Sequence, residues 1–480
     1  MPVENEVTTD YCFANNRRLS KSFESLAKQL FQKPQLHDLE FNKKDEDIVS
    51  FMQSYEYQVS PWPLVIDEAF ISELDDLFTQ LPKIMHKVLR YFFTNDMSWA
   101  CEYLNIQRFQ AELFLQSQPK LANICARYDI VMSGGTIQLI EINSGGSLGG
   151  WQLGLLESQC FKALQNLDTH TWRYEHQNVI CNLFNAYCQS ILDIVGPSSS
   201  GNILLYLSAD FVKSETLPSL RRSFQTIYKK IRPSEFANGD LFYFENPDEV
   251  NVNEKGEVYF NGIKMDAVIL SVKKENELPK TFVCHLEAAA LNEEFYYPDA
   301  VNLTILGNKL LFAFLHEAKV RAQLDEVEAE LVKKYIPWST KLNQLEKDWS
   351  GGKVKPDQWL NQKKSELVIK KAHSQQGKDV VIGTDCTLKE WKCLRSDITD
   401  PDDWLVQKYM APDPVVLLDP DCGLNNFDTV WGVFALSGHY SGGFIRGTIS
   451  HTGDKVINSA RGASEFLLLE EKTAKTKLVI

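Results

Sequence analysis

The stretch DIVMSGGTIQLIEINSGGSLGGW, residues 129–151, decides the fold of this chain. A predicted strand over residues 138–143 runs into a loop of small residues, 144–150. Glu141 and Asn143 are two positions apart, so in a strand both side chains point to the same face. A carboxylate and an amide oxygen beside a Gly/Ser loop suit a Mg²⁺ ion that carries nucleotide phosphates, because Mg²⁺ takes hard oxygen ligands. The alternative is an ordinary strand that ends in a glycine-rich turn.

The composition is that of a globular protein, with 44% apolar and 24% charged residues in a chain of 480. The net charge of -14 argues against a nucleic-acid partner, since phosphate backbones require clustered Lys and Arg. Ten cysteines without a CxxC pair indicate reduced thiols, and hence a cytoplasmic protein. The N-terminal residues show no signal-peptide pattern, and no apolar run approaches the roughly 18 residues that would predict a membrane span.

The order of helical and strand patterns predicts an α/β fold of the mixed α+β kind. Residues 1–60 form a polar N-terminal segment, and residues 61–200 are a mainly helical region. Residues 201–305 read as strand, helix and strand, which predicts a small α/β domain. Residues 306–480 contain both helical and strand patterns.

A second segment has the features of a phosphate-covering lid. Residues 365–383, SELVIKKAHSQQGKDVVIG, predict a strand, a flexible loop and a second strand. Lys370 closes the first strand and Gly377 lies in the loop, where backbone N–H groups can approach phosphate oxygens. A solvated hairpin is the alternative for this segment.

Later segments suit the base and the reacting groups of a nucleotide. Residues 404–412 predict an apolar strand whose backbone can face an adenine edge. Residues 430–449 predict a hairpin that turns near Ser437-Gly438, and its second strand carries Arg446, which can reach a phosphate or carboxylate with two hydrogen bonds. A buried strand and a surface arginine are the alternatives. Residues 308–347 read as helical, with a break at Pro337-Trp338.

In their order along the chain these segments resemble the circularly permuted ATP-grasp ligases. That family includes eukaryotic glutathione synthetase and the synthetase half of glutathionylspermidine synthetase. The resemblance covers roughly residues 128–463 and implies a permuted ATP-grasp fold with an inserted substrate domain. It implies that residues 61–200 hold the metal-binding part of the core and that residues 201–305 form the substrate-binding domain. Residues 306–480 would hold the nucleotide-binding part, with a lid at about residues 366–400. The pieces that carry it are, in order, Arg127-Tyr-Asp129, Glu141-Ile-Asn143, Ser147-Leu-Gly-Gly, Asn308-Lys-Leu-Leu, Ile336-Pro-Trp, Val368-Ile-Lys370, Val406-Gln-Lys-Tyr, Gly443-Phe-Ile-Arg446 and Asn458-Ser-Ala-Arg-Gly-Ala463.

The resemblance implies ATP and Mg²⁺ as cofactors and a role for each matched residue. The implied metal ligands are Glu141 and Asn143, with Asp129 as a further candidate. The residues implied to bind ATP are Lys309 and Lys370 at the phosphates and Gln407, Lys408, Tyr409 and Met410 at the adenine. The implied catalytic residues are Arg446 and Arg127, and those at the substrate are Ser144 and Ser147.

The lid departs from the family pattern. The family usually has an acidic residue four positions after the lid lysine as a further metal ligand, and here that position is Ser374. Asp129, Asp379 and a water molecule are the candidates to replace it. The lid is also poor in glycine, with Gln376 and Asp379 where glycines are common, and Lys371 stands where the family has proline.

The function that the resemblance implies is an ATP-dependent ligase. It would join a carboxylate, from an amino acid or a short peptide, to an amine through an acyl phosphate, and release ADP and phosphate. Its partners would be small-molecule or peptide substrates, and the sequence leaves the oligomeric state open, a homodimer included. Two alternatives also stay open. A phosphotransferase on the same scaffold would need no amine, and a non-catalytic ATP-binding or regulatory protein would account for the altered lid.

Other classes of enzyme lack their signatures in this sequence. The nine histidines show no zinc spacing such as HxxxH or HExxH. There is no GxSxG nucleophile elbow and no GxxxxGK[ST] phosphate loop. These absences argue against a zinc enzyme, a serine hydrolase of that type and a P-loop enzyme.

Overall fold

The computed structural model describes residues 3–42, 44–45, 48–117, 120–168, 172–207, 216–271, 278–345, 355–372, 379–450 and 455–472. Within these residues the chain is a mixed α/β protein with several sheets. None of the helices in these ranges is both long and apolar enough to cross a membrane. All ten cysteines are free thiols, as their spacing predicts.

The largest sheet brings together strands from both ends of the chain. Its strands are β1 (Val59–Ile66), β2 (Cys125–Ser133), β3 (Thr136–Ser144), β4 (Arg173–Glu175), β15 (Val415–Asp419), β16 (Gly423–Leu436), β17 (His439–Ile449) and β18 (Ser464–Lys472). In the described part of the chain these eight strands follow the order β1-β18-β17-β16-β2-β3, with β15 beside β16 and β4 beside β18. β1 runs parallel to β18, and the other pairs are antiparallel.

β16 and β17 form the hairpin that the sequence predicts around Ser437 and Gly438. Both residues have positive φ, 54° and 78°, as in the two-residue turns that match the right-handed twist of paired strands. The pairing continues to Phe427 opposite Ile449. Arg446 is therefore a residue of the sheet itself and not of a surface loop.

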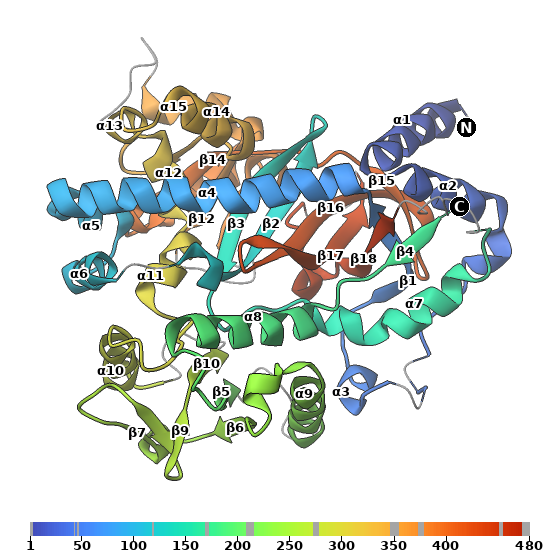
Figure 1. The fold of residues 1–480 in the computed structure, drawn as a ribbon. Coiled ribbons are helices and arrows are strands. Elements are labelled where there is room, and N and C mark those ends of the chain that lie inside the picture. The colour runs from blue at the N-terminus through green and yellow to red at the C-terminus, as the bar shows by residue number, and fades with distance from the viewer. Residues whose placement is uncertain are drawn as a thin grey trace, which may run out of the picture.

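Helices cover both faces of this sheet (Figure 1). The long helix α4 (Glu68–Asn95) runs along one face, while α7 (Glu157–Leu164) and α8 (Val179–Ile194) lie on the other. The Asp67 side chain caps α4 by accepting a hydrogen bond from the amide of Phe70. The buried residues of α4 recur every three or four positions, which gives the helix one apolar stripe to pack on the sheet.

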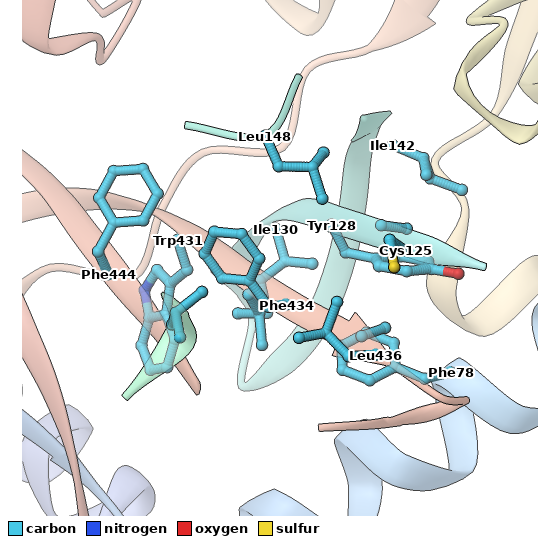
Figure 2. Close-up of a cluster of buried hydrophobic side chains, with 14 of the residues drawn as sticks. Phe78, Cys125, Tyr128, Ile130, Ile142, Leu148, Trp431, Phe434, Leu436 and Phe444 are labelled. Carbon is cyan, nitrogen blue, oxygen red and sulfur yellow. The ribbon is translucent and has the colours of Figure 1, made fainter. Parts of the chain in front are cut away.

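The core below α4 is built from the central strands. Figure 2 shows Tyr128 and Ile130 of β2 together with Trp431 and Phe434 of β16, and Phe78 of α4 beside Tyr128. All five side chains are buried. The rings of Phe78 and Tyr128 have centroids 4.6 Å apart. This packing fixes the position of β2, whose alternate residues point to the opposite face of the sheet.

Two smaller sheets come from the middle of the chain, in the lower part of Figure 1. Strands β5 (Ile203–Leu207), β6 (Leu241–Phe244) and β10 (Ala267–Ser271) form a parallel sheet in the order β10-β5-β6, accompanied by helices α9 (Leu217–Ile231) and α10 (Lys280–Ala290). Strands β7 (Val250–Val252), β8 (Val258–Phe260) and β9 (Ile263–Met265) form an antiparallel sheet.

A fourth sheet carries the predicted lid strands. Its strands are β11 (Ser339–Lys341), β12 (Leu367–Lys371), β13 (Val380–Ile382) and β14 (Trp404–Lys408), in the order β11-β14-β12-β13. It has its own buried cluster, which includes Ile369, Trp391 and Val406. The helical prediction for residues 308–347 is wrong over β11, because this short segment is held as a strand by its pairing with β14, a neighbour distant in sequence.

The remaining helices flank these sheets. They are α1 (Val3–Leu19), α2 (Lys21–Gln32), α3 (Ser50–Gln53), α5 (Met97–Leu104), α6 (Arg108–Gln116), α11 (Val301–Thr304), α12 (Leu310–His316), α13 (Ala318–Arg321), α14 (Glu326–Tyr335), α15 (Pro356–Gln362) and α16 (Leu388–Asp397). The sequence analysis reads residues 1–60 only as a polar segment. The helices α1 and α2 within it pack against β15 and α2 also against β1.

Candidate functional site

A cavity of about 830 Å³ is lined by residues of the eight-stranded sheet and of the four-stranded sheet. Asp379, a candidate metal ligand, does not line it, but the other described residues with a predicted site role do. These residues are Arg127, Asp129, Glu141, Asn143, Ser144, Ser147, Lys309, Lys370, Gln407, Lys408, Tyr409, Met410 and Arg446. The structure thus brings together groups that are up to about 300 positions apart in the sequence, while their individual roles stay predictions.

Four polar side chains of β2 and β3 lie together in this wall as two cross-strand pairs. In the register of the two strands, Arg127 lies opposite Asn143 and Asp129 lies opposite Glu141. Directly opposite residues have Cβ atoms roughly 4.5–5.5 Å apart, and like charges in such a pair repel. Asp129 and Glu141 therefore need cations beside them. Arginine side chains pair with Asp129, and a lysine pairs with Glu141.

Asp129 is held by two arginines. Its Oδ1 accepts a hydrogen bond of 2.8 Å from Nε of Arg127, and its Oδ2 accepts one of 2.8 Å from Arg446. Burial acts to raise the pKa of Asp129, but the two guanidinium groups outweigh it and hold the pKa below its ordinary value. The carboxylate therefore orients both arginines, and its predicted role as a metal ligand stays a prediction.

The two arginines keep some capacity to bind a ligand. Nε of Arg446 is buried and has no hydrogen-bond partner. Arg127 also donates to the carbonyl of Gly149 in the glycine-rich loop, at 2.9 Å. The ring of Phe444 lies beside both guanidinium groups, with its centroid 5.7 Å from Arg127 and 5.4 Å from Arg446, which helps to hold their positions.

The two lysines come from different parts of the fold. Nζ of Lys309, at the start of α12, lies 3.0 Å from Oε1 of Glu141. Nζ of Lys370, on β12, donates to Oε1 of Gln407 at 2.8 Å and to the carbonyl of Ile140 at 3.2 Å. Both lysines are buried. The site therefore holds two ammonium groups ready for an anionic ligand.

Burial lowers the pKa of Lys370 to about 8. The neighbouring Glu141 acts in the opposite direction and raises it, while the charge of Lys309 lowers it further. A second ammonium group and the loss of water both disfavour the protonated form. An anion such as a phosphate would favour it, so the lysine is charged most readily when a ligand is bound.

The glycine-rich loop after β3 is held from the parallel sheet. Asp299 accepts hydrogen bonds from the amide of Gly146 at 2.7 Å and from the amide of Leu270 at 3.0 Å. At the end of the loop Gly150 has φ of 103°. A Cβ atom there would lie 2.0 Å from the Phe444 ring. Glycine is therefore required at this position for both conformation and space.

Ser144 and Ser147 lie on this loop and both line the cavity. Oγ of Ser144 donates to the carbonyl of Thr304 at 2.9 Å. That bond ties the end of β3 to α11, so in this structure the Ser144 hydroxyl has a structural partner. Its predicted contact with a substrate stays a prediction.

The segment predicted to face adenine follows β14. The side chain of Gln407 is occupied within the protein, since it accepts from Lys370 and donates to Oγ of Ser339 at 3.1 Å. The backbone amide of Tyr409 donates to the carbonyl of Glu366 at 2.8 Å. Apolar side chains near this segment line the same cavity, namely Val131, Ile140, Val368, Val380, Ile382, Met410 and Ile457. They make a wall suited to a flat aromatic base.

The oxygen donors of Glu141 and Asn143 fit a nucleotide-borne magnesium ion. The pair with Lys309 engages Oε1 of Glu141 and leaves the other carboxylate oxygen for a metal. The Nδ2 atom of Asn143 is buried without a hydrogen-bond partner, and as a donor it suits a phosphate oxygen next to such an ion. Among the described residues there is no group of three or more His, Cys, Asp or Glu that would hold a metal. Mg²⁺ commonly takes one or two protein carboxylates and completes its shell with phosphate oxygens and water.

The central lid residues lie outside the described part of the chain. Ser374, Gln376 and Gly377, which the sequence analysis singled out, belong to residues 373–378. Asp379 is described, and its carbonyl accepts a hydrogen bond from the amide of Lys371. The lid strands on either side pair as predicted, with Lys370 opposite Val380.

Two residues of the cavity wall were missed from the sequence. Glu465 on β18 is buried and accepts a hydrogen bond of 2.7 Å from the hydroxyl of Tyr55. A carboxylate inside the apolar run of residues 463–469 was a usable signal, because charged side chains are rarely buried without a partner. No comparable signal marks Tyr55, whose segment reads as a polar loop.

Comparisons with solved structures show which fold this is. The chain is similar to a glutathione synthetase-like effector from Globodera pallida in its apo form, with a TM-score of 0.53 and 12% identity over 93% of this chain and 97% of that chain. A provisionally named gamma-glutamylcysteine synthetase from Methylobacillus flagellatus gives a TM-score of 0.38 and 10% identity over 82% and 88% of the two chains, too weak a similarity to bear on the fold. No protein-family model matches the sequence, and no curated protein matches it either.

Proposed function

We propose that this protein is an ATP-dependent carboxylate–amine ligase with a circularly permuted ATP-grasp fold. The observation that carries the proposal is the cavity itself, which collects all the residues that the resemblance implies for ATP, metal and substrate. The fold shared with a glutathione synthetase-like effector supports it. The substrates would be an amino acid or short peptide that supplies the carboxylate, and a second molecule that supplies the amine.

In this proposal the nucleotide lies between the two sheets that line the cavity. Lys309 and Lys370 bind its phosphates, and the segment from Gln407 to Met410 lies along its adenine. The apolar side chains of that region pack on the base. The residues around 201–305, which include the parallel sheet β10-β5-β6, form the substrate-binding domain, and residues 366–400 form the lid.

Glu141 and Asn143 would hold Mg²⁺ together with the phosphates of the nucleotide. When bound, the ion supplies positive charge that screens the phosphate oxygens from an incoming carboxylate. Lys309 keeps Glu141 in place from the opposite side, at 3.0 Å. The ion that Glu141 and Asn143 would hold and the ammonium groups of the two lysines would thus share the neutralisation of the phosphate charge.

The proposed reaction has two steps. A carboxylate oxygen of the first substrate attacks the γ-phosphorus of ATP, the bond to the bridging oxygen breaks, and ADP and an acyl phosphate form. The amine nitrogen of the second substrate then attacks the acyl carbon, and phosphate leaves. The unpartnered Nε of Arg446 is placed to donate to the oxygens that become more negative along this path.

The protein contributes mainly position and preorganised charge. Asp129 fixes Arg127 and Arg446, so these groups need little rearrangement when charge develops. The residues next to the lid strands must also exclude water, because water would hydrolyse the acyl phosphate. Acid–base residues with tuned pKa values are less important in such a reaction than correct orientation.

The experiment that tests this function measures nucleotide products. The protein is incubated with ATP, Mg²⁺ and pooled amino acids and short peptides, with each pool divided into members that have a blocked carboxylate and members that have a blocked amine. We expect ADP and phosphate only when a free carboxylate and a free amine are both present. ADP formation without an amine would indicate a phosphotransferase, and nucleotide binding without turnover in any pool would indicate a non-catalytic ATP-binding protein.

A further inference from the structure

Glu465 is a buried carboxylate that lines the cavity from β18, the strand between β1 and β17 of the large sheet. It lies on β18, directly opposite Arg446 of β17 in the antiparallel register. It is 3% exposed, and its atoms line the same cavity as Arg446. Directly opposite residues of antiparallel strands share one face, with Cβ atoms roughly 4.5–5.5 Å apart. The two opposite charges are therefore neighbours within the wall of the site.

These neighbours do not form an ion pair. Arg446 donates instead to Asp129 at 2.8 Å, on the side away from β18, and its Nε has no partner. Glu465 accepts from the hydroxyl of Tyr55 at 2.7 Å and from that of Ser459. Among the described residues no Lys, Arg or His nitrogen pairs with Glu465. A buried carboxylate normally has a cation or several strong donors.

Two hydroxyl groups leave Glu465 with unused acceptor capacity. An ionised carboxylate offers about four lone-pair positions, and the neutral hydroxyls of Tyr55 and Ser459 fill two of them. Neither hydroxyl supplies charge. The remaining positions belong to a carboxylate that lines the cavity.

The surroundings of Glu465 suit an organic cation. The rings of Tyr55 and Tyr57 meet edge to face with centroids 5.4 Å apart, and both line the cavity. Aromatic faces attract ammonium groups, most strongly where water is excluded. A divalent metal fits this place poorly, because the described residues supply too few further hard oxygen donors there.

We propose that Glu465 binds the positively charged amino group of the second substrate, with Tyr55 and Ser459 as positioning residues. This inference rests on the proposed ligase function and names the place of the amine within it. The amine would be held on β18 beside Arg446 on β17, so that it lies next to the acyl phosphate formed there. The substrate is then a primary amine that enters the site in its protonated form. Its nitrogen passes one proton to the Glu465 carboxylate, which frees the lone pair that attacks the acyl carbon, and phosphate leaves with a second proton of the amine.

The test compares a cationic probe with a neutral one of the same shape. Binding of glycinamide, which carries an ammonium group and no carboxylate, and of glycolamide, which has a hydroxyl in its place, is measured by saturation-transfer NMR with and without magnesium-ADP. We expect the wild-type protein to bind glycinamide and not glycolamide. Glu465→Gln should weaken glycinamide binding about tenfold or more, because a charge-assisted hydrogen bond is replaced by a neutral one.

The matched control is Glu56→Gln, the same change at an exposed carboxylate that lines the same cavity. This control should bind glycinamide as the wild type does. Tyr55→Phe removes one hydroxyl donor to Glu465 and should weaken binding by a smaller factor, which gives a second reading if Glu465→Gln fails to fold. Circular dichroism of each variant checks the fold.

Two results would overturn the proposal. One is equal binding of glycinamide by the wild type, Glu465→Gln and Tyr55→Phe, and the other is no binding by the wild type under either condition. Calorimetric titration with magnesium-ADP separates this failure from failure of the ligase proposal. A protein that binds magnesium-ADP but not glycinamide keeps its nucleotide site and loses only the amine site. A protein that binds glycinamide through Glu465 but does not bind magnesium-ADP keeps the amine site, and the proposed nucleotide site fails.

Discussion

Asp129 and Arg446 form an ion pair of 2.8 Å although 317 positions separate them in the sequence. Asp129 lies on β2 and Arg446 on β17, and the strand β16 runs between them in the sheet. Both side chains are buried. The pair therefore joins the early, strand-forming segment of the chain to its late hairpin, and it fixes an arginine that lines the cavity.

Asp129→Asn should destabilise the fold. The change removes the carboxylate charge that pairs with both Arg127 and Arg446 and leaves the two guanidinium groups buried. Breaking a buried ion pair in this way costs about 3–5 kcal/mol. Urea unfolding at neutral pH measures the difference in the free energy of unfolding. Asp96→Asn is the control, because its pair with Lys319 is exposed and worth about 1 kcal/mol or less.

The same pair predicts a dependence of stability on pH. The pKa of Asp129 lies below its ordinary value in the folded protein, so the unfolded chain takes up this proton more readily. The stabilisation by Asp129 is therefore full above the ordinary pKa of an aspartate and is lost as the pH falls through the folded-state pKa. The gap in stability between wild type and Asp129→Asn should narrow in acid, and a constant gap would contradict the assignment.

ATP affinity should fall as the pH rises from 7 to 9, because burial lowers the pKa of Lys370 to about 8. Deprotonation removes one positive charge from the phosphate site. Lys370→Arg keeps its charge in this range and should remove the pH dependence, while Lys370→Met should bind ATP weakly at every pH. Calorimetric titration over this range measures all three proteins. Unchanged affinity in Lys370→Met would show that the phosphates bind elsewhere.

Glu141→Gln should raise the Mg²⁺ concentration needed for ATP binding. The effect should be at least as large as the roughly 10- to 100-fold that loss of an outer partner of a metal ligand costs. The fold should persist, since the Glu141 side chain is partly exposed. Glu73→Gln is the matched control, because Glu73 also pairs with a lysine, Lys334, but on the surface. Equal Mg²⁺ requirements in the two variants would remove Glu141 from the metal site.

Gly150, at the end of the glycine-rich loop, allows a steric test against Gly134, in the turn between β2 and β3. Gly150 and Gly134 both have positive φ, 103° and 60°. A Cβ at Gly150 would lie 2.0 Å from the Phe444 ring, whereas a Cβ at Gly134 would have nothing within 4 Å. Gly150→Ala should therefore lower the melting temperature much more than Gly134→Ala, since overpacking adds about 1–3 kcal/mol to the backbone strain that both share. Similar melting temperatures would mean that the loop rearranges freely.

The strands that carry the candidate site could be predicted because they have strong local patterns. The alternation around Glu141 and Asn143, the turn at Ser437 and the paired lid strands around Lys370 all follow from periodicity of neighbouring residues. The structure confirms these strands and the hairpin. Their meeting in one cavity followed from the family resemblance and not from any of the patterns alone.

Other parts of the fold depend on pairing between distant segments. β1 contains Pro61 and Pro63, which obscure a strand pattern, yet it pairs in parallel with β18 at the edge of the sheet, where prolines are tolerated. β4 interrupts a segment that reads as helical and pairs with β18. No local pattern in residues 59–66 or 173–175 predicts pairing with a strand about 300–400 positions away.

The hydrogen-bond partners of individual side chains could not be predicted from the sequence either. Gln407 stood out as an adenine contact, but in the structure its amide binds Lys370 and Ser339. Whether a polar side chain faces a ligand or a neighbour depends on its rotamer and on the strands around it. The same holds for Glu465, whose position opposite Arg446 comes from the register of β17 and β18.

The measurement that tests the central claim most directly follows oxygen from the acid to the phosphate. Pooled amino acids and short peptides whose carboxylates are labelled with heavy oxygen are incubated with ATP, Mg²⁺ and the protein, and the released phosphate is weighed by mass spectrometry. An acyl-phosphate ligase gives ADP together with phosphate that carries one heavy oxygen. Labelled AMP with pyrophosphate would mean that the carboxylate is adenylated. ADP with unlabelled phosphate would mean that water attacks the γ-phosphate. Either result would contradict the proposed reaction.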